Sequence, residues 1–417
     1  MTDGHFGGLS PTARVHNGIA LGRCVGEGEN FLRDYWGRVP YLHVGNDSFT
    51  DLLSIADVDH IISSTLMRWP AFRMFKNGQL LDQNLYTRST ILAGTTLTDA
   101  LDPARVLNQF YEGATIVLHG LQKYWSPITR FCHDLETLLT HPVQCNAYIT
   151  PPHSRGLGLH YDTHDVLILQ TTGSKHWSVY DRFADQPLAW ERFVAARLPE
   201  ERESKTPRLE AELTAGHCLY IPTGYLHQAE STSEVSVHLT VGISTYRWYD
   251  VLLEILNVAT EEVAFREPLP VGFANDVDGM AEEVEQHLKL FTWWLDTIDR
   301  HNLAKRVADR FRSTRPPLLA GQLQQLARIG RLSDDSLVAR RRSSFVSLER
   351  DTAKNTLLVF LDGRRLEMPL RLDSVMETLI EKPHFRVGEL SQYLDEDSRL
   401  VLVRRLIREG LLEILAD

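Results

Sequence analysis

The sequence predicts an α+β fold in which a jelly roll or barrel of short antiparallel strands lies between helical segments. Two observations lead to this prediction. Short apolar runs, separated by turn residues, follow one another between about residues 143 and 243, a spacing typical of antiparallel strands in a jelly roll. Before and after this segment, apolar residues recur three and four positions apart, which is the period of helices.

The expected strands are short and apolar. They cover residues 143–149, 165–171, 175–180, 217–222 and 236–243. Runs of this length between turn residues fit strands that pair with their neighbours. An antiparallel barrel built from them can hold a ligand in its mouth.

Helices and one hairpin are expected before the strands. The segment 29–40 starts with helical spacing, with Phe31, Leu32 and either Tyr35 or Trp36 on one side, and Pro40 then forces an extended exit. Further helices are expected at 51–66, 103–111 and 126–139. Asn77-Gly78 lies between two apolar runs and predicts a hairpin.

After about Arg247 the pattern is helical again. Helices are expected at 248–262 and 276–311, and the second carries Phe291 and Trp294 among apolar residues three and four positions apart. A helix with so much aromatic surface needs a partner. It can pack on the barrel, but a helical layer after a complete barrel is also a common contact between subunits, and we expect a homodimer.

The last segment, from about residue 338, has the element order of a winged helix. A hairpin over Asp362-Gly363 precedes helices at 373–381, 387–394 and 397–409 and a strand at 412–415. DNA binding would use the third helix, which carries Arg399, Arg404, Arg405 and Arg408. Acidic residues roughly balance the basic ones in this segment, so a structural role is favoured over DNA binding.

These patterns divide the chain into three expected domains. A barrel domain covers residues 1–250, a helical dimerisation domain covers 251–335, and a winged-helix-like domain covers 336–417. The turn-rich segments 268–279 and 313–317 are the linker candidates.

Charge and composition exclude several classes of protein. The formal net charge of −11 over 417 residues argues against a polyanion as the main partner. The N-terminus lacks the basic and apolar regions of a signal peptide, and no apolar run approaches the length of a membrane span. We expect a cytoplasmic protein. Its four cysteines, Cys24, Cys132, Cys145 and Cys218, form no Cys-x-x-Cys pair and are expected to be reduced thiols.

One short segment places a histidine and a carboxylate two residues apart, His160 and Asp162. In a strand these side chains share a face while Tyr161 points away. His227 follows a tight turn much later in the chain and offers a second imidazole. Two histidines and one carboxylate leave half of an octahedron open, as a non-haem Fe(II) centre requires. His164 lies on the same face by alternation, but a role in supporting the metal ligands is the less favoured interpretation.

Lys175 follows one strand later, beside Trp177. A lone ammonium group buried in a barrel is costly unless an anion accompanies it. A dicarboxylate co-substrate would supply that anion, with one carboxylate on Lys175 and a 2-oxo acid end on the metal. The alternative is a lysine at a turn with its head in solvent. The His-x-Asp pair upstream favours the first interpretation.

Several motifs extend this pattern along the chain. They are Tyr35-Trp-Gly-Arg-Val-Pro40, Asn146-Ala-Tyr148, His160 to Gln170, Gly173 to Trp177, Ile221 to Ala229, and Ser236-Val-His-Leu-Thr. Together they resemble the ribosomal oxygenases, a cupin-like group with a JmjC domain. The resemblance covers nearly the whole chain. It implies a double-stranded β-helix (the cupin or JmjC jelly roll), a helical dimerisation region and a C-terminal winged helix.

The resemblance also implies an activity. Such a protein would use Fe(II), 2-oxoglutarate and O₂ to hydroxylate a side chain of a protein, for example a His or Arg of a ribosomal protein. The roles carried over to this chain are iron binding by His160, Asp162 and His227, binding of the 5-carboxylate of 2-oxoglutarate by Lys175, and lining of the pocket by Asn146, Tyr148 and, more weakly, Ser236 and Ser244. Alternation leaves the facing of the two serines open.

Three alternatives remain at the level of the sequence. The same iron chemistry could act on a small molecule or a biosynthetic peptide, or it could remove an N-methyl group. A binding protein with a DNA-reading winged helix and a cupin sensor is the third. Succinate formation that depends on Fe(II) and substrate separates the oxygenases from the sensor, and an oxygen-sized mass shift, as against formaldehyde release, separates hydroxylation from demethylation.

Overall fold

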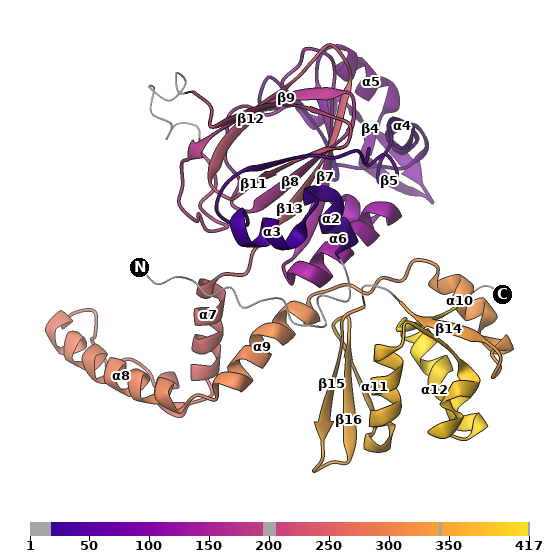
Figure 1. Cartoon of the computed structure of the whole chain (residues 1–417). Helices are drawn as coiled ribbons and strands as arrows, with labels where there is room; N and C mark the ends of the chain where they lie inside the picture. Colours follow the sequence, from indigo (N-terminus) through magenta and orange to yellow (C-terminus); the bar gives the residue numbers. More distant parts are fainter. Residues whose placement is uncertain (1–17, 195–205, 342–343, 416–417) are drawn as a thin grey trace. The chain divides into compact units, whose positions relative to one another are not determined.

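A computed structural model describes residues 18–194, 206–341 and 344–415 (Figure 1). The chain forms two compact units, Met1–Thr245 and Tyr246–Asp417. The expectation that the N-terminal residues form no signal peptide concerns residues outside the described ranges. No helix within the described ranges is both long and apolar enough to cross a membrane.

The first unit is built around a large antiparallel sheet. Its eight strands have the order β1-β11-β8-β13-β7-β6-β2-β3. Their bounds are β1 Tyr41–Val44, β2 Phe72–Lys76, β3 Gln79–Leu80, β6 Thr115–Leu118, β7 Val143–Thr150, β8 Asp165–Thr172, β11 His217–Ile221 and β13 Ser236–Ile243. In the centre, β13 pairs with both β7 and β8, so Gly242 lies beside Gln144 on one side and Val166 on the other.

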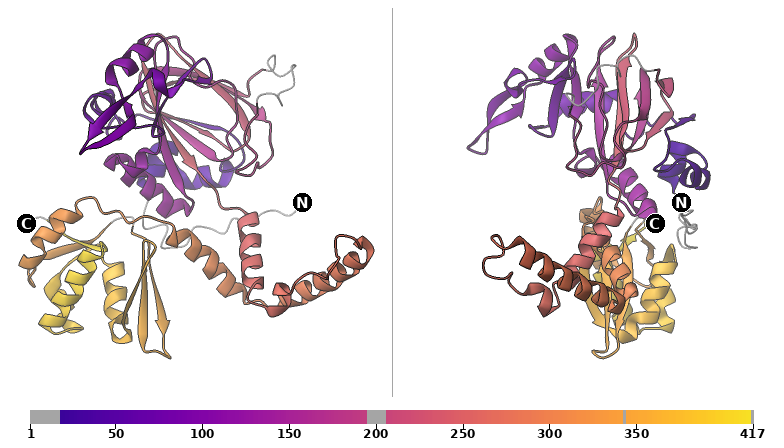
Figure 2. Two further views of the ribbon diagram at one scale, coloured as in Figure 1. Left: turned by 180° about the vertical axis from the view of Figure 1, so that it is seen from behind. Right: turned by 90° about the vertical axis from the view of Figure 1, so that its left-hand side faces the viewer.

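A smaller sheet faces the large one. Its order is β10-β9-β12, with β9 at Ser174–Arg182, β10 at Leu209–Thr214 and β12 at Tyr225–Ser231. A buried apolar cluster joins the two sheets, with Val166 and Ile168 from the large sheet and Trp177, Val179 and Leu213 from the small one. The two layers of strands are visible from behind and from the side in Figure 2. The space between them is the barrel interior.

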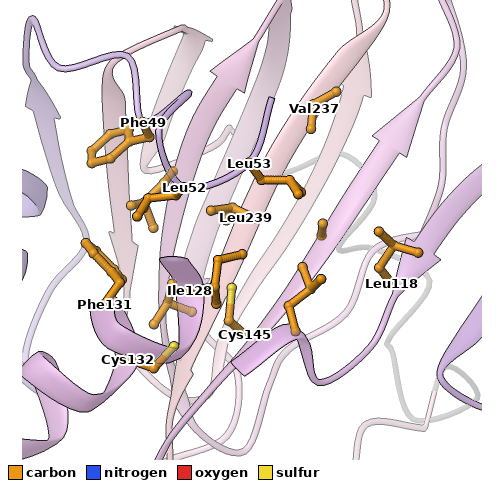
Figure 3. Close-up of a cluster of buried hydrophobic side chains, with 14 of the residues drawn as sticks. Phe49, Leu52, Leu53, Leu118, Ile128, Phe131, Cys132, Cys145, Val237 and Leu239 are labelled. Carbon is orange, nitrogen blue, oxygen red and sulfur yellow. The ribbon is translucent and has the colours of Figure 1, made fainter. Parts of the chain in front are cut away.

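Helices cover the opposite face of the large sheet. They are α2 Ile19–Val25, α3 Gly28–Asp34, α4 Ile55–Ser64, α5 Pro103–Tyr111 and α6 Ser126–Leu139. The strand residues that alternate away from the interior, such as Cys145, Val237 and Leu239, pack with Leu53 and Ile128 in the main core (Figure 3). Alternation therefore divides each central strand between this core and the barrel interior.

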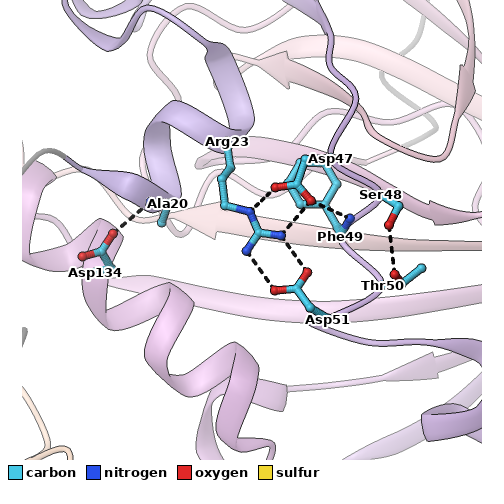
Figure 4. Close-up of polar contacts among 8 residues, drawn as sticks. All are labelled: Ala20, Arg23, Asp47, Ser48, Phe49, Thr50, Asp51 and Asp134. Atoms are coloured by element: carbon cyan, nitrogen blue, oxygen red, sulfur yellow. Dashed lines mark hydrogen bonds and ion pairs between the residues drawn. The ribbon is translucent and has the colours of Figure 1, made fainter.

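Local sequence signals set several helix ends. Ser54 caps α4 and forms a reciprocal capping box with Asp57. Asp102 caps α5, and Pro103 occupies its first turn. Arg23 of α2 donates hydrogen bonds to both Asp47 and Asp51 and so fixes the loop before α4 (Figure 4).

The second unit begins with helices. They are α7 Trp248–Ala259, α8 Val277–Thr297, α9 Arg300–Ser313 and α10 Gln322–Arg328. Glu254 of α7 accepts a hydrogen bond from Arg306 of α9 at 2.8 Å, and Phe265 packs against Phe291 and Trp294 of α8.

The rest of the second unit combines two small sheets with helices around a core of its own. The sheets have the orders β15-β16-β17 and β18-β14-β19. The elements are β14 Leu337–Arg340, β15 Val346–Asp351, β16 Thr356–Leu361, β17 Arg364–Pro369, α11 Asp373–Glu381, β18 His384–Arg386, α12 Glu396–Arg408 and β19 Leu412–Ile414.

The structure corrects some of the expected elements. The helix expected at 51–66 begins only after its Ser54 cap. The one expected at 276–311 is two helices, because Ile298 leaves helical geometry and Asp299 caps a new helix. The segment 387–394 forms a 3-10 helix, Val387–Gln392. Several elements were not predicted from the sequence: the hairpin of β4 Thr87–Leu92 and β5 Thr95–Leu101, the helix α2, and the strands β1, β6, β10 and β12.

Candidate active site

His160 and His227 lie opposite each other across an isolated bridge between two backbone segments. His160 N donates to His227 O at 3.1 Å, and His227 N donates to His160 O at 2.8 Å. His227 belongs to β12. His160 does not belong to a strand, so the prediction that a β segment holds both His160 and Asp162 is wrong in this detail. The paired backbone nevertheless brings the two imidazoles to a centroid distance of 4.4 Å.

The two histidines are fixed in the same tautomer. Nδ1 of His160 lies 2.8 Å from Gly158 O, and Nδ1 of His227 lies 3.0 Å from Tyr225 O. A carbonyl oxygen only accepts, so each Nδ1 carries the proton and each Nε2 keeps its lone pair. Metal-binding histidines are oriented in this way by a backbone or carboxylate partner.

Hydrogen bonds to its main-chain carbonyl oxygen hold Asp162 in place. Its carbonyl oxygen accepts from Gly224 N at 3.0 Å and from Thr223 Oγ1 at 3.1 Å. Asp165 accepts from Thr223 N at 2.8 Å and from Tyr220 Oη at 2.5 Å. The segment with Asp162 and the turn before β12 are thereby tied together.

Donor atoms of His160, Asp162 and His227 all lie within 4.8 Å of one another. Burial lowers the pKa of His227 to about 4, with the neighbouring His160 acting in the same direction. Burial works to raise the pKa of Asp162, but the imidazoles of His160, His164 and His227 outweigh it and hold that pKa below its usual range. Two imidazoles and one carboxylate form a donor set that fits a divalent metal ion.

Lys175 lies inside the barrel, on β9. Its side chain is buried, and Nζ donates to Thr150 Oγ1 at 3.0 Å. No carboxylate forms an ion pair with it among the residues that the structure describes. Burial lowers the pKa of Lys175 to about 7. An unpaired buried ammonium group of this kind fits an anionic ligand.

Aromatic and polar side chains surround this lysine. The ring of His238 stacks on Tyr148 at 5.0 Å and meets Trp177 edge to face at 5.4 Å. Burial, with the charge of Lys175 next in effect, lowers the pKa of His238 well below its usual value. Nδ1 of His238 and Nε1 of Trp177 are buried, and neither has a hydrogen-bond partner among the residues that the structure describes. A polar ligand beside Lys175 could satisfy such atoms.

Three of the other predicted site residues, Asn146, Tyr148 and Ser236, also face the interior. Asn146, Tyr148 and Thr150 alternate along β7, and Oδ1 of Asn146 accepts from Gly120 N at 3.0 Å. Ser236 lies opposite Thr150 in the register, is buried, and accepts from Gln170 Nε2 at 2.9 Å. Ser244 follows the end of β13 and is exposed.

Sequence reasoning missed Thr150, Gln144 and the position of His238 beside Lys175. Thr150 and Gln144 stand at even spacing from Asn146 and Tyr148, so strand alternation alone could have placed them on the interior face. His238 is likewise two residues beyond Ser236. Their roles could not be assigned, because the sequence does not show which strands pair.

The chain is similar to known proteins in two ways. The JmjC domain family matches residues 120–251. "Ribosomal oxygenase 1" of Gallus gallus is 31% identical over 255 residues, which is 58% of this chain and 40% of that protein. "Bifunctional lysine-specific demethylase and histidyl-hydroxylase NO66" of Dictyostelium discoideum is 31% identical over 258 residues, which is 58% of this chain and 47% of that protein. The chain thus spans less than half of each of these two relatives.

A solved structure of YcfD, a ribosomal oxygenase from Escherichia coli, resembles the whole chain in fold. In complex with cobalt and 2-oxoglutarate it aligns with a TM-score of 0.51 over 94% of this chain and 99% of YcfD, at 14% identity. Another structure of the same protein aligns with a TM-score of 0.56. The likeness confirms the predicted cupin-like fold of mixed helices and sheets.

Proposed function

We propose that this chain, which matches the JmjC domain family over residues 120–251 and resembles ribosomal oxygenases, is an Fe(II)- and 2-oxoglutarate-dependent hydroxylase of a protein side chain. The observation that carries the proposal is the convergence of His160, Asp162 and His227 in the same barrel as a buried lysine that lacks a carboxylate partner.

In this proposal the three donors hold iron, and Lys175 pairs with the far carboxylate of 2-oxoglutarate. With 2-oxoglutarate and O₂, the bound iron supplies the oxidation of a substrate C–H bond to an alcohol, and 2-oxoglutarate becomes succinate and CO₂. The chain's own residues position the reactants. Gly158 and Tyr225 orient the imidazoles through their carbonyls, and Thr150 steers the ammonium group of Lys175. Tyr148, Asn146 and Ser236 line the interior.

The charges around the proposed site favour a neutral target side chain. Among the described residues near the site, the carboxylate of Asp162 belongs to the metal donors, and that of Asp165 is engaged by Thr223 and Tyr220. A buried guanidinium would need a further carboxylate. Histidine of a ribosomal protein is therefore the target that we propose over arginine.

The test is a search for the modified protein. The purified enzyme is incubated with Fe(II), 2-oxoglutarate and a lysate of a strain that lacks it, and peptides are screened for a gain of one oxygen. We expect such a gain on histidine of a ribosomal protein, together with succinate. Turnover of small molecules alone, or release of formaldehyde, would overturn the proposal in favour of the other oxygenase classes.

A matched pair of variants checks the metal site. His160→Ala removes one donor and should abolish metal binding and succinate formation. His176→Ala removes a half-exposed histidine from β9 of the same barrel, where it lies 3.9 Å from Glu210, and should leave both unchanged. Full activity of His160→Ala would contradict the metal assignment.

We also propose that α8 contributes to a homodimer. One face of this helix, lined by Glu285, Leu288, Lys289, Thr292, Trp293 and Asp296, forms a shallow surface pocket. Leu288 is 59% exposed and Trp293 is 64% exposed. Tryptophan is enriched among residues that dominate binding energy, and apolar centres with charged rims are typical of interfaces. A second copy of the chain offers the same face and is the occupant we propose.

The C-terminal part, residues 336–417, is proposed to be a winged helix with a structural role. On α12, Arg399 is tied to Asp334 at 2.8 Å, and Arg405 is tied to Glu409 at 2.7 Å. Both are thereby engaged within the chain. The division into domains at 1–250, 251–335 and 336–417 and a cytoplasmic location remain parts of this proposal. Fluorescence anisotropy with duplex DNA should show no affinity beyond the non-specific range of about 10⁻⁴ to 10⁻⁶ M.

A further inference from the structure

The backbone conformation at Gly242 is one that residues other than glycine can also adopt. Gly242 is buried within β13, between β7 and β8, and its φ lies outside the left-handed region. Glycine weakens the interior of a strand and often marks a close approach by another group. A Cβ at this position would lie 2.5 Å from both Cδ2 and Nε2 of His164 and 3.3 Å from Cγ of Gln144. The ring of His164 therefore occupies the space that a side chain would need.

His164 stands on the interior face, next to the metal donors but not among them. The group of converging donors comprises His160, Asp162 and His227. The imidazole of His164 is still near enough to influence the charge on both Asp162 and His227. His164 follows Asp162 by two residues and packs against Gly242 on the interior face, so it lies beside the metal donors.

The surroundings of His164 differ from those of the two histidine ligands. His160 and His227 are each anchored to a backbone carbonyl at 3.0 Å or less. His164 is half-buried, and its Nε2 lies 3.4 Å from Nε2 of Gln144, which is exposed. An imidazole and an amide, two groups able to donate and accept hydrogen bonds, thus stand together beside the metal site, and within the described part of the chain no shorter hydrogen bond engages either of them.

We propose that His164 and Gln144 bind a peptide group of the protein substrate, close to the side chain that is hydroxylated, and that Gly242 is present because it gives the His164 ring its place. Side chains able to donate and accept hydrogen bonds match the N–H and C=O of a substrate main chain. The inference rests on the proposed function and deepens it by naming a substrate-positioning residue.

The test uses five variants of the full chain and a synthetic peptide around the modified residue found in the lysate experiment. His164→Ala should raise the KM for the peptide about tenfold, as expected for one lost hydrogen bond of about 1.4 kcal/mol. Its kcat, and the KM for 2-oxoglutarate, should stay within twofold of the parent. His164→Asn, which keeps a donor and an acceptor, should recover most of the loss.

Gly242→Ala should produce the same rise in the peptide KM without any change to His164 itself, because the new Cβ displaces the ring. In the His164→Ala background the second change should add nothing, which gives a non-additive cycle. Gly22→Ala, where nothing lies within 4 Å, is the matched control and should leave the KM unchanged.

The visible absorption of the Co(II)-loaded variants supplies a readout besides activity. The spectrum should be the same in the parent, His164→Ala and Gly242→Ala. A changed spectrum with an unchanged peptide KM would overturn the proposal, because His164 would then support the metal site. Additive effects of the two substitutions would overturn the role of Gly242. If the parent modifies no protein yet turns over 2-oxoglutarate, it is the proposed function that fails.

Discussion

Lys175 illustrates how one buried side chain makes ligand binding depend on pH. Within the described ranges its ammonium group donates to the hydroxyl of Thr150 and pairs with no carboxylate, and burial lowers its pKa to about 7. The unfolded chain holds this proton up to about its ordinary value of 10.5. The unfolded state therefore binds more protons between these two values, and the stability of the ligand-free protein should rise as the pH increases from about 7 to about 10.5.

Binding of 2-oxoglutarate should show the opposite trend. A carboxylate beside Lys175 raises its pKa, so that binding at pH 8 takes up about one proton, while binding at pH 6 takes up almost none. Above about pH 7 the affinity should fall by up to tenfold per pH unit. Titration calorimetry of the Co(II)-loaded protein in buffers of different ionisation enthalpy measures the proton uptake directly.

Two substitutions make this prediction specific. Lys175→Met should abolish the proton uptake and weaken 2-oxoglutarate binding at both pH values. Lys289→Met removes an exposed lysine that pairs with Glu285 on α8, and it should change neither quantity. Equal proton uptake by the parent at pH 6 and pH 8 would contradict the role of Lys175.

At the scale of residues, the sequence allows the chemistry of the site to be predicted, but it does not allow the contacts between the site residues to be predicted equally well. The spacing of His160 and Asp162 and the isolated lysine are enough to suggest a metal and an anionic co-substrate. The carbonyls of Gly158 and Tyr225 that fix the tautomers cannot be predicted, because main-chain hydrogen bonds leave no signal in residue types. The position of His238 beside Lys175 depends on the pairing of β13 with β7 and β8, which no local pattern specifies.

The turn before β12 is the element on which the site depends most. Gly224 has φ +80°, and a Cβ there would lie 1.9 Å from Ala184 O. Its N–H donates to Asp162 O, and His227 follows three residues later. A change in this turn therefore moves a carboxylate donor and an imidazole donor together.

Gly224→Ala should thus lower both stability and metal affinity. The left-handed backbone alone costs about 1–2 kcal/mol for a residue other than glycine, and the clash with Ala184 adds to it. Gly94→Ala is the matched control, because Gly94 has φ +79° in a turn with nothing within 4 Å. Denaturant unfolding should show a larger loss for Gly224→Ala, and only this variant should bind Co(II) more weakly. Equal losses would show that backbone strain alone is at work.

The differences between expected and observed elements have identifiable causes. Apolar periodicity continues across Ile298 and hides the break between α8 and α9, although Asp299 is a residue type that caps helices. The strand β12 has an irregular register with β9 between Tyr225 and His227, which obscures its alternation. Pairing partners lie far apart in the sequence, so the elements were easier to predict than the order of the sheet.

The proposed dimer makes a prediction for the whole molecule. Replacing Leu288 or Trp293 with Asp buries a charge at the centre of the proposed interface and should weaken dimerisation by about thirtyfold or more. Leu323→Asp alters a residue of α10 that is 81% exposed and should leave association unchanged. Sedimentation velocity over a range of concentrations distinguishes the outcomes. A parent protein that stays monomeric throughout would contradict the interface.

The separate cores of the two units lead to a further prediction. The barrel has two buried clusters of its own, and the second unit has another. Co(II) with 2-oxoglutarate at a hundred times its Kd should stabilise the first unit by about 2.7 kcal/mol. Scanning calorimetry of the full chain should show one transition that moves with ligand and one that does not. His160→Ala should abolish the shift of the ligand-dependent transition. A single transition for the full chain, moving as a whole with ligand, would show that the two units unfold together and would contradict the prediction.

The contact between His164 and Gly242 also constrains how the sequence of this protein can change over generations. While position 164 holds an imidazole, any side chain at position 242 collides with it. While position 242 is glycine, position 164 can change without a steric clash at 242. Substitutions at the two positions should therefore be accepted in one order, with the ring lost before the glycine. Among descendants of a common ancestor, a bulkier residue at 242 should be found with a small residue at 164, as a record of that order.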